Sequence, residues 1–201
     1  MLGAALSAGS ARGQVAPVAE PAAGPTFMSA RFASVGALTL YGGYRVGALL
    51  GFVGLVQNPR TEYREAIVGI GRTFAFGSRT SLLAGLAVAD ASDAEYTQVY
   101  LLPQVVVGAL LFDGTIEGYL PMGARGGAQL SATPLNLLYR PVGRHAVGVS
   151  YVNGIQRGQT PVHALGPSLR LGIPHGTLAL DVLHNTGQRT RDVRVTAQVA
   201  Y

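Results

Sequence analysis

The amino-acid sequence predicts an all-β protein: a transmembrane up-and-down antiparallel β-barrel of about ten strands, with a range of roughly 8 to 12. Three observations predict this class. Apolar and polar residues alternate over many short stretches, as in strands with one apolar face. Charged residues make up only 12% of the chain, about half of the roughly 25% usual in soluble domains, which leaves little to cover a water-facing surface. The longest uninterrupted apolar run, Val46 to Val56, is too short for a membrane-spanning helix but suits a tilted transmembrane strand.

The first 13 residues have features of a secretory signal peptide that lacks its basic start. An apolar run from Leu2 to Ala8 is followed by small residues. Ala11 and Gly13 then stand at the −3 and −1 positions of a cleavage site. The sequence therefore predicts a truncated signal peptide over 1–13.

A linker and an N-terminal segment are predicted over 14–43, and the barrel over 44–201. The linker is expected from the Ala- and Pro-rich composition of the first part. The second part, 25–41, alternates as a strand does. It would form an extra strand, half of an extra hairpin, or a plug.

Turn-forming sequences divide the barrel region into its strands. The predicted strands are 44–56, 64–76, 79–90, 95–111, 114–122, 129–140, 144–153, 163–173, 176–186 and 191–201. Short turns are predicted at Gly42-Gly43, Gly77-Ser78, Asp113-Gly114, Val142-Gly143 and Pro174-His175. Longer polar loops are predicted at 57–64, 90–96, 123–129, 153–161 and 186–192. Because short and long connections alternate, the short turns should gather at one end of the barrel.

Each strand has one apolar face and one small or polar face. In 163–173, for example, Leu165, Leu169 and Leu171 share the face expected to meet lipid, and Arg170 belongs to the other. The charged inward positions have both signs and would form either a paired lumenal network or the lining of a narrow pore. The candidate lumen residues are Glu65, Glu117, Arg140, Arg170, Asp181 and Arg194.

Aromatic residues near the strand ends predict two interfacial girdles. The girdle at the short-turn end would contain Tyr41, Tyr44, Phe74, Phe76, Phe112, Tyr139 and Tyr201. The girdle at the loop end would contain Tyr63, Tyr96, Tyr119 and Tyr151.

The last stretch, "DVRVTAQVAY", alternates to an aromatic final residue. It resembles the C-terminal strand of small bacterial outer-membrane β-barrels, OmpA/OmpX-like in the broad sense, although their final residue is usually phenylalanine. The resemblance implies a Gram-negative outer-membrane protein that is recognised by the barrel assembly machinery, with a structural or porin-like narrow-pore role. The residues that match the assembly signal are Val193, Val195, Ala197, Val199 and Tyr201.

Two other functions are compatible with the pattern. The first is a barrel enzyme acting on lipid acyl chains, for which His184 and His163, the latter near Ser168, would be the pair to test, although no hydrolase motif accompanies them. The second is a soluble barrel that binds an apolar ligand, in which the Leu165, Leu169 and Leu171 face would point inward.

Other partners and cofactors follow from what the sequence contains. The chain has no cysteine, and its histidines do not have the spacing of metal ligands, so that no cofactor or metal is expected. The arginines are scattered and accompany no nucleic-acid motif. The lipid bilayer is the expected environment, and arginines of the outer loops are candidates for anionic glycolipid. These loop arginines are Arg60, Arg64, Arg125, Arg157, Arg189 and Arg191.

Overall fold

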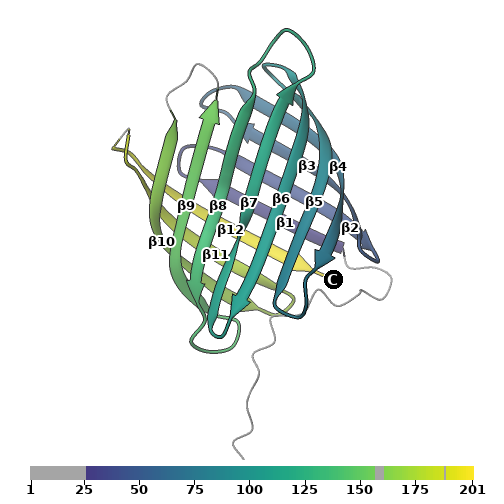
Figure 1. Ribbon diagram of the computed structural model, residues 1–201. Helices are drawn as coiled ribbons and strands as arrows, with labels where there is room; N and C mark the ends of the chain where they lie inside the picture. Colours follow the sequence, from purple (N-terminus) through teal and green to yellow (C-terminus); the bar gives the residue numbers. More distant parts are fainter. Residues whose placement is uncertain (1–25, 157–160, 188) are drawn as a thin grey trace, which may run out of the picture.

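The computed structural model describes residues 26–156, 161–187 and 189–201, which form one closed antiparallel barrel of 12 strands (Figure 1). The predicted signal peptide, the first part of the linker and Arg157 lie outside the described residues. The strands are β1 (Thr26–Ala33), β2 (Leu38–Val46), β3 (Leu49–Asn58), β4 (Tyr63–Ala75), β5 (Thr80–Ala91), β6 (Glu95–Val107), β7 (Leu110–Pro121), β8 (Gln129–Tyr139), β9 (Ala146–Gln156), β10 (Val162–Ile173), β11 (Gly176–Asn185) and β12 (Arg191–Ala200). Within the described residues, no helix is long and apolar enough to cross a membrane.

The barrel begins at residue 26 rather than at 44, because β1 and β2 form an additional hairpin. β1 pairs with β12 over seven positions and thereby closes the cylinder. The strand count is therefore two above the ten that the sequence favours and at the top of the predicted range. The uncertain segment 25–41 contributes β1 and the start of β2, so it is part of the wall and not a plug.

Two of the predicted turns are wrong, since Gly42-Gly43 lies inside β2 and Asp113-Gly114 inside β7. The turns are instead at 47–48 and 108–109, where Gly47 and Gly108 both have φ of 58°, a conformation that two-residue hairpin turns require. Gly43 has a packing role. A Cβ atom there would lie 2.3 Å from Cε1 of Phe27 and 2.8 Å from the Gly51 carbonyl oxygen.

The two ends of the barrel differ in their connections. The lower end in Figure 1 carries the turns 47–48, 76–79, 108–109, 140–145 and 174–175, together with Thr26 and Tyr201. The connections after β1, β3, β5, β7, β9 and β11 lie at the upper end. The contrast in length is weaker than predicted, because the lower connections include the six-residue segment 140–145.

The outer face of the wall is a band of exposed apolar side chains. Val68 and Ile70 are 60% and 58% exposed, and Leu165, Leu169 and Leu171 also point outward. This direction contradicts the soluble-barrel alternative, which needs the three leucines inside. An outer surface of this kind suits lipid.

The predicted lower girdle is largely present, whereas most of the upper one is not. Six outward aromatic residues lie near the lower end, namely Tyr44, Phe74, Phe76, Phe112, Tyr139 and Tyr201. Tyr41 is the exception, since it points inward and packs on Phe52, with ring centroids 6.2 Å apart. At the upper end Tyr63, Tyr96 and Tyr119 also occupy inward positions, because strand parity and not height decides the direction of a side chain.

Inward aromatic rings lie over glycines of the neighbouring strands. The Tyr41 ring covers Gly54, and the Phe52 ring covers Gly69. Tyr100 of β6 places its hydroxyl over Gly85 of the neighbouring β5 and over Gly71 of β4, one strand further along the wall. Many glycines of this chain thus make room for rings on the inner wall, a use distinct from forming turns.

Replacing Gly69 by alanine should destabilise the barrel by about 1–3 kcal/mol, because the methyl group overpacks the wall. The new Cβ would lie 2.4 Å from Cε1 of Phe52 and 2.8 Å from Cβ of Ala87. Urea unfolding in detergent, followed by the gel mobility of unboiled samples, measures the effect. Gly51→Ala is the matched control, since nothing lies within 4 Å of a Cβ at this outward position. Equal stability of the two variants would contradict the packing role.

Candidate functional site: the barrel lumen

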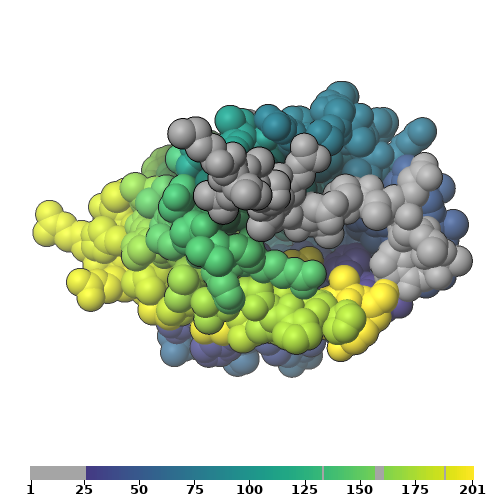
Figure 2. Space-filling view, turned by 90° about the horizontal axis from the view of Figure 1, so that it is seen from below, coloured from purple at the N-terminus to yellow at the C-terminus, as the bar shows by residue number. Residues whose placement is uncertain are grey.

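The lumen is lined by polar side chains that alternate with the apolar outer band. Glu65 and Asp181 are each 5% exposed, Asn136 is 2% exposed and Ser150 is fully buried. Figure 2 looks at the lower end of the barrel, where a hollow is visible beside the green turn region. The interior is therefore polar along part of the wall, whereas the side formed by β3 to β6 carries a buried apolar cluster.

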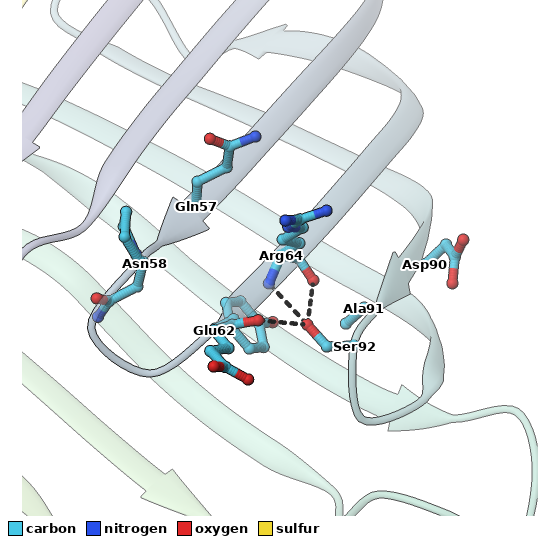
Figure 3. A pocket seen from close by; sticks show the side chains of 9 residues that line it. Gln57, Asn58, Glu62, Arg64, Asp90, Ala91 and Ser92 are labelled. Carbon is cyan, nitrogen blue, oxygen red and sulfur yellow. Dashed lines mark hydrogen bonds between the residues drawn. The ribbon is translucent and has the colours of Figure 1, made fainter.

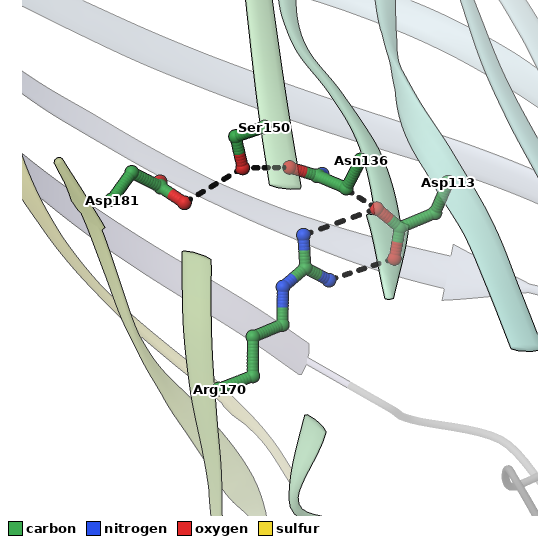
Figure 4. Close-up of polar contacts among 5 residues, drawn as sticks. All are labelled: Asp113, Asn136, Ser150, Arg170 and Asp181. Carbon is green, nitrogen blue, oxygen red and sulfur yellow. Dashed lines mark hydrogen bonds and ion pairs between the residues drawn. The ribbon is translucent and has the colours of Figure 1, made fainter. Parts of the chain in front are cut away.

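A chain of polar contacts crosses five consecutive strands, β7 to β11 (Figure 4). Arg170 binds Asp113 through both terminal nitrogens, at 2.7 and 3.1 Å. Asn136 donates to Asp113 Oδ1 at 2.7 Å. The Ser150 hydroxyl then bridges the side-chain oxygens of Asn136 and Asp181, at 2.8 Å from the Asp181 carboxylate. Bidentate arginine–carboxylate geometry of this kind holds both side chains in fixed positions.

Nearer the upper end, carboxylates accept hydrogen bonds from tyrosines. Tyr63 donates to Glu65 Oε2 at 3.1 Å. Tyr119 donates to Glu117 Oε2 at 3.4 Å, and Ser131 donates to the same oxygen at 3.3 Å. These bonds explain why the upper tyrosines are better placed inside the barrel than in a lipid-facing girdle.

A second ion pair lies where β12 leaves the upper end. Arg194 Nε is 2.7 Å from Asp192 Oδ2, and Ser34 donates to the other carboxylate oxygen at 3.2 Å. Arg31 of β1 donates to Thr196 at 3.3 Å. The charges of Arg194, Glu117 and Asp181 are also close enough to act on Arg31. Polar contacts thus hold the seam between β1 and β12, and charges of the neighbouring lumen wall act on it.

The lower end of the lumen carries arginines with neutral surroundings. Arg45, next to the last residue of β2, donates to the Thr73 hydroxyl at 3.3 Å. Arg140 directly follows β8, and its buried Nε has no hydrogen-bond partner among the described residues. Neither arginine has a carboxylate within ion-pair distance in the described part of the chain.

All six predicted lumen residues lie at inward positions, but the structure distributes them over several clusters. Arg170 and Asp181 join the same network, although they do not touch each other. Glu65 and Glu117 bind different tyrosines, Arg194 pairs with Asp192, and Arg140 lies at the lower opening.

The sequence analysis missed Asp113 and Asp192 because it assigned one to a turn and the other to a loop. Both are the carboxylate partners of predicted arginines. The signal that could have found Asp113 is the alternation of side chains along the strand. Once the turn is placed at 108–109, Leu111, Asp113 and Glu117 lie on the same, inward face of β7.

The lumen requires hydration, because several of its buried polar atoms lack protein partners. Buried polar groups in folded proteins are satisfied by protein or by water. The unpartnered atoms among the described residues are Glu65 Oε1, Gln98 Nε2, Tyr100 Oη, Arg140 Nε, Asn153 Oδ1, Ser168 Oγ and Arg170 Nε. A water-containing interior satisfies them, whereas a dry core would leave each one at a cost of about 1–3 kcal/mol.

The groups that a lipid hydrolase would need are on opposite sides of the wall. His163 and His184 point outward, while Ser168 is buried on the lumen side. His163 instead contacts the Tyr151 hydroxyl through Nδ1 at 2.9 Å. The structure therefore does not bring the two histidines and Ser168 together in one site. In the described part of the chain, no group of three or more His, Asp or Glu residues could hold a metal ion.

A groove of about 700 Å³ lies at the upper rim, beside the loops after β3 and β5 (Figure 3). Ser92, in the loop after β5, binds the start of β4, since its hydroxyl oxygen accepts from the Arg64 amide at 2.7 Å and lies 3.1 Å from the Arg64 carbonyl oxygen. Gln57, Arg64 and Asp90 line the groove from outward positions of their strands. Inward Tyr63 also lines it, so the groove lies at the edge between the outer face and the lumen.

The C-terminal strand is paired on both sides. Ala197 pairs with Ala30 of β1 and with Leu178 of β11. The Tyr201 amide donates to the Thr26 carbonyl at 2.9 Å, and its ring stacks on His175 with centroids 6.0 Å apart. The residues of the predicted assembly signal are Val193, Val195, Ala197, Val199 and Tyr201, and they lie on the outward parity of this strand.

Comparison with known proteins identifies the class of fold. No protein-family model matches the sequence, and no curated protein sequence does. Solved structures of porins match over 88% of this chain. The KdgM porin has a TM-score of 0.63 at 14% identity, with 99% of its chain covered. The KdgM porin in complex with disordered oligogalacturonate has a TM-score of 0.64 at 14% identity, again with 99% covered. The NanC porin has a TM-score of 0.59 at 8% identity, with 98% covered. The chain thus shares the closed-barrel fold of these small porins.

Proposed function

We propose that this protein is a non-catalytic outer-membrane β-barrel that forms a narrow pore for small solutes. The observation that carries the proposal is the set of polar side chains and unpartnered buried polar atoms inside a wall whose outer face is apolar. Such a wall is stable in lipid because closure satisfies the strand edges, and such an interior provides a path for water-soluble molecules. The porin fold and the broad OmpA/OmpX-like character of the C-terminal strand support the same location.

The expected passage is narrow. A barrel of about 8 strands is filled by its side chains, whereas about 16–18 strands leave a wide aqueous channel. Twelve strands lie between these limits. Aromatic rings on the β2, β3 and β6 walls and the polar network on the opposite wall further reduce the free width.

Liposome swelling tests the pore directly. Proteoliposomes containing the folded protein should swell in small sugars, and the rate should fall steeply as the sugar becomes larger. Because one fold neighbour was solved with oligogalacturonate, uronic-acid oligomers are useful solutes for the series. Liposomes with boiled protein provide the control. No swelling with any solute, despite incorporation of folded barrel, would overturn the proposal.

We also propose that the barrel assembly machinery recognises the C-terminal strand. Tyr201→Asp should lower the amount of folded barrel in the membrane severalfold, because it places a charge at the aromatic end of the signal and removes the stacking on His175. Heat-modifiable protein in isolated membranes is the measurement. Tyr201→Phe keeps an aromatic end and should assemble normally. Normal assembly of the aspartate variant would refute the role of this residue.

Anionic glycolipid is a proposed partner of the upper loops. Arg191 points outward and pairs in register with the outward His184 of β11, so that a guanidinium and an imidazole of neighbouring strands lie side by side. Arg189→Gln together with Arg191→Gln should reduce the glycolipid that co-purifies with the barrel, as quantified by phosphate analysis. Arg72→Gln, on the outer face near the lower end, is the control. Unchanged lipid in the double variant would remove this proposal.

A further inference from the structure

We infer that the lumen is electrically polarised along its axis and that the pore rectifies ionic current. This inference rests on the proposed pore and adds a direction to it. It follows from the unequal distribution of inward charges between the two ends of the barrel.

The lower part of the lumen is basic. The arginines lie towards the lower ends of their strands. Arg45 is next to the last residue of descending β2, Arg140 follows descending β8, and Arg170 lies near the lower end of β10. Arg144 lies in the 140–145 connection. A Cβ atom added at inward-facing Gly172 would be 2.2 Å from the Arg144 Cβ, so Arg144 lies against the inner face of β10. Among the described residues, one inward carboxylate side chain stands against these four arginines, that of Asp113, which Arg170 already binds. The lower connections of the described chain contain no acidic residue.

The middle and upper lumen has the opposite balance. Two arginines, Arg31 and Arg194, are present at this level. They face four carboxylates, which are Glu65, Glu117, Asp181 and Asp192. At the upper rim, acidic and basic loop residues are intermixed, which leaves the inner wall to set the sign of the potential.

Two zones of opposite charge in series pass current unequally. When the upper side is positive, anions move up from the basic zone and cations move down from the acidic zone, so both carriers accumulate in the lumen. The reverse polarity draws each carrier away and depletes the lumen. Low-dielectric walls strengthen the effect because they focus the field of the fixed charges.

Single-channel recording in planar bilayers tests this inference. In symmetric 0.1 M KCl, currents at opposite voltages of equal size should differ by roughly twofold or more, with the larger current when the upper side is positive. In 1 M KCl, where the screening length falls from about 10 to about 3 Å, the ratio should approach one. Since the chain has no cysteine, Ser78→Cys in a lower turn, probed with an impermeant thiol reagent, reports which end faces each chamber.

Two sets of variants locate the charges. Arg45→Gln with Arg140→Gln should bring the current ratio towards one, and Glu65→Gln with Glu117→Gln should do the same from the other zone. Arg72→Gln is the matched control, because Arg72 points outward near the lower end and lies 5.5 Å from the centre of the Phe74 ring. Heat-modifiability confirms folding of each variant.

The outcomes separate the two proposals. Linear, symmetric currents from the wild-type pore at 0.1 M KCl would overturn the inference but leave the proposed pore intact. Rectification that persists in both double variants would also overturn the inference and leave the pore intact. Absence of any channel activity from folded barrel would overturn the proposed pore itself, and rectification with it.

Discussion

Asp113→Ala is expected to destabilise the barrel by about 3 kcal/mol, at the lower end of the range for breaking a buried ion pair because the lumen is hydrated. The substitution leaves the Arg170 guanidinium unpaired, and its Nε already lacks a partner among the described residues. It also removes the acceptor of the Asn136 amide. Urea titration of the detergent-solubilised barrel measures the loss.

A double-mutant cycle distinguishes this network from a general loss of charge. Asp113→Ala and Arg170→Ala should be coupled by about 0.5–3 kcal/mol, because they share one interaction. Asp90→Asn, at an exposed outward position of β5, should change stability by less than about 0.5 kcal/mol. Strict additivity of the two alanine variants would contradict the network in Figure 4.

Leu180→Arg is expected to cost about 2–4 kcal/mol, which is the penalty for a charge on the lipid face near the bilayer midplane. Leu180 points outward from β11, and its register partners Leu169 and Val195 are also apolar and exposed. The measurement is the folding equilibrium in lipid vesicles. An outward residue in contact with water would tolerate arginine. The size of the loss in folding free energy therefore shows whether Leu180 faces lipid or water.

His184→Arg is the matched control, because it lies on the same strand and the same face, four residues closer to the upper end. Its register partner is Arg191, at the edge of the apolar band. We expect a cost of only about 0–1 kcal/mol there. Similar costs at both positions would indicate that the outer band does not lie in lipid.

The alternation of apolar and polar residues, together with turn-forming sequences, was sufficient to predict many of the barrel strands. The strands predicted at 163–173 and 176–186 differ from β10 and β11 by one residue or less at each end. Alternation in these strands is strict, and the turn at Pro174-His175 is unambiguous. The same alternation correctly separated outward Leu165 from inward Arg170.

Where local signals conflict with packing, the sequence was misleading. Gly42-Gly43 has the composition of a hairpin turn, yet Gly43 is glycine because the Phe27 ring occupies the space of a side chain. The ring and the glycine belong to different strands, so their contact depends on the register between β1 and β2. This position, together with the unrecognised turn between β1 and β2, accounts for the missed hairpin and the strand count of ten.

The pairings inside the lumen also depend on the closed barrel. Arg170 and Asp113 are 57 positions apart in sequence, and Ser34 and Asp192 are 158 apart. Strand parity can indicate that each residue faces inward. Which inward residues meet is set by strand number and stagger, since these determine the heights of opposite positions on the wall.

The most direct test of the central claim is the conductance of folded, heat-modifiable protein in a planar lipid bilayer. The claim is that a continuous polar lumen crosses the membrane inside an apolar wall. It predicts discrete, reproducible current steps that remain small, as expected of a narrow pore, and that disappear when the protein is boiled. Folded protein that inserts into the bilayer without any current steps would contradict it.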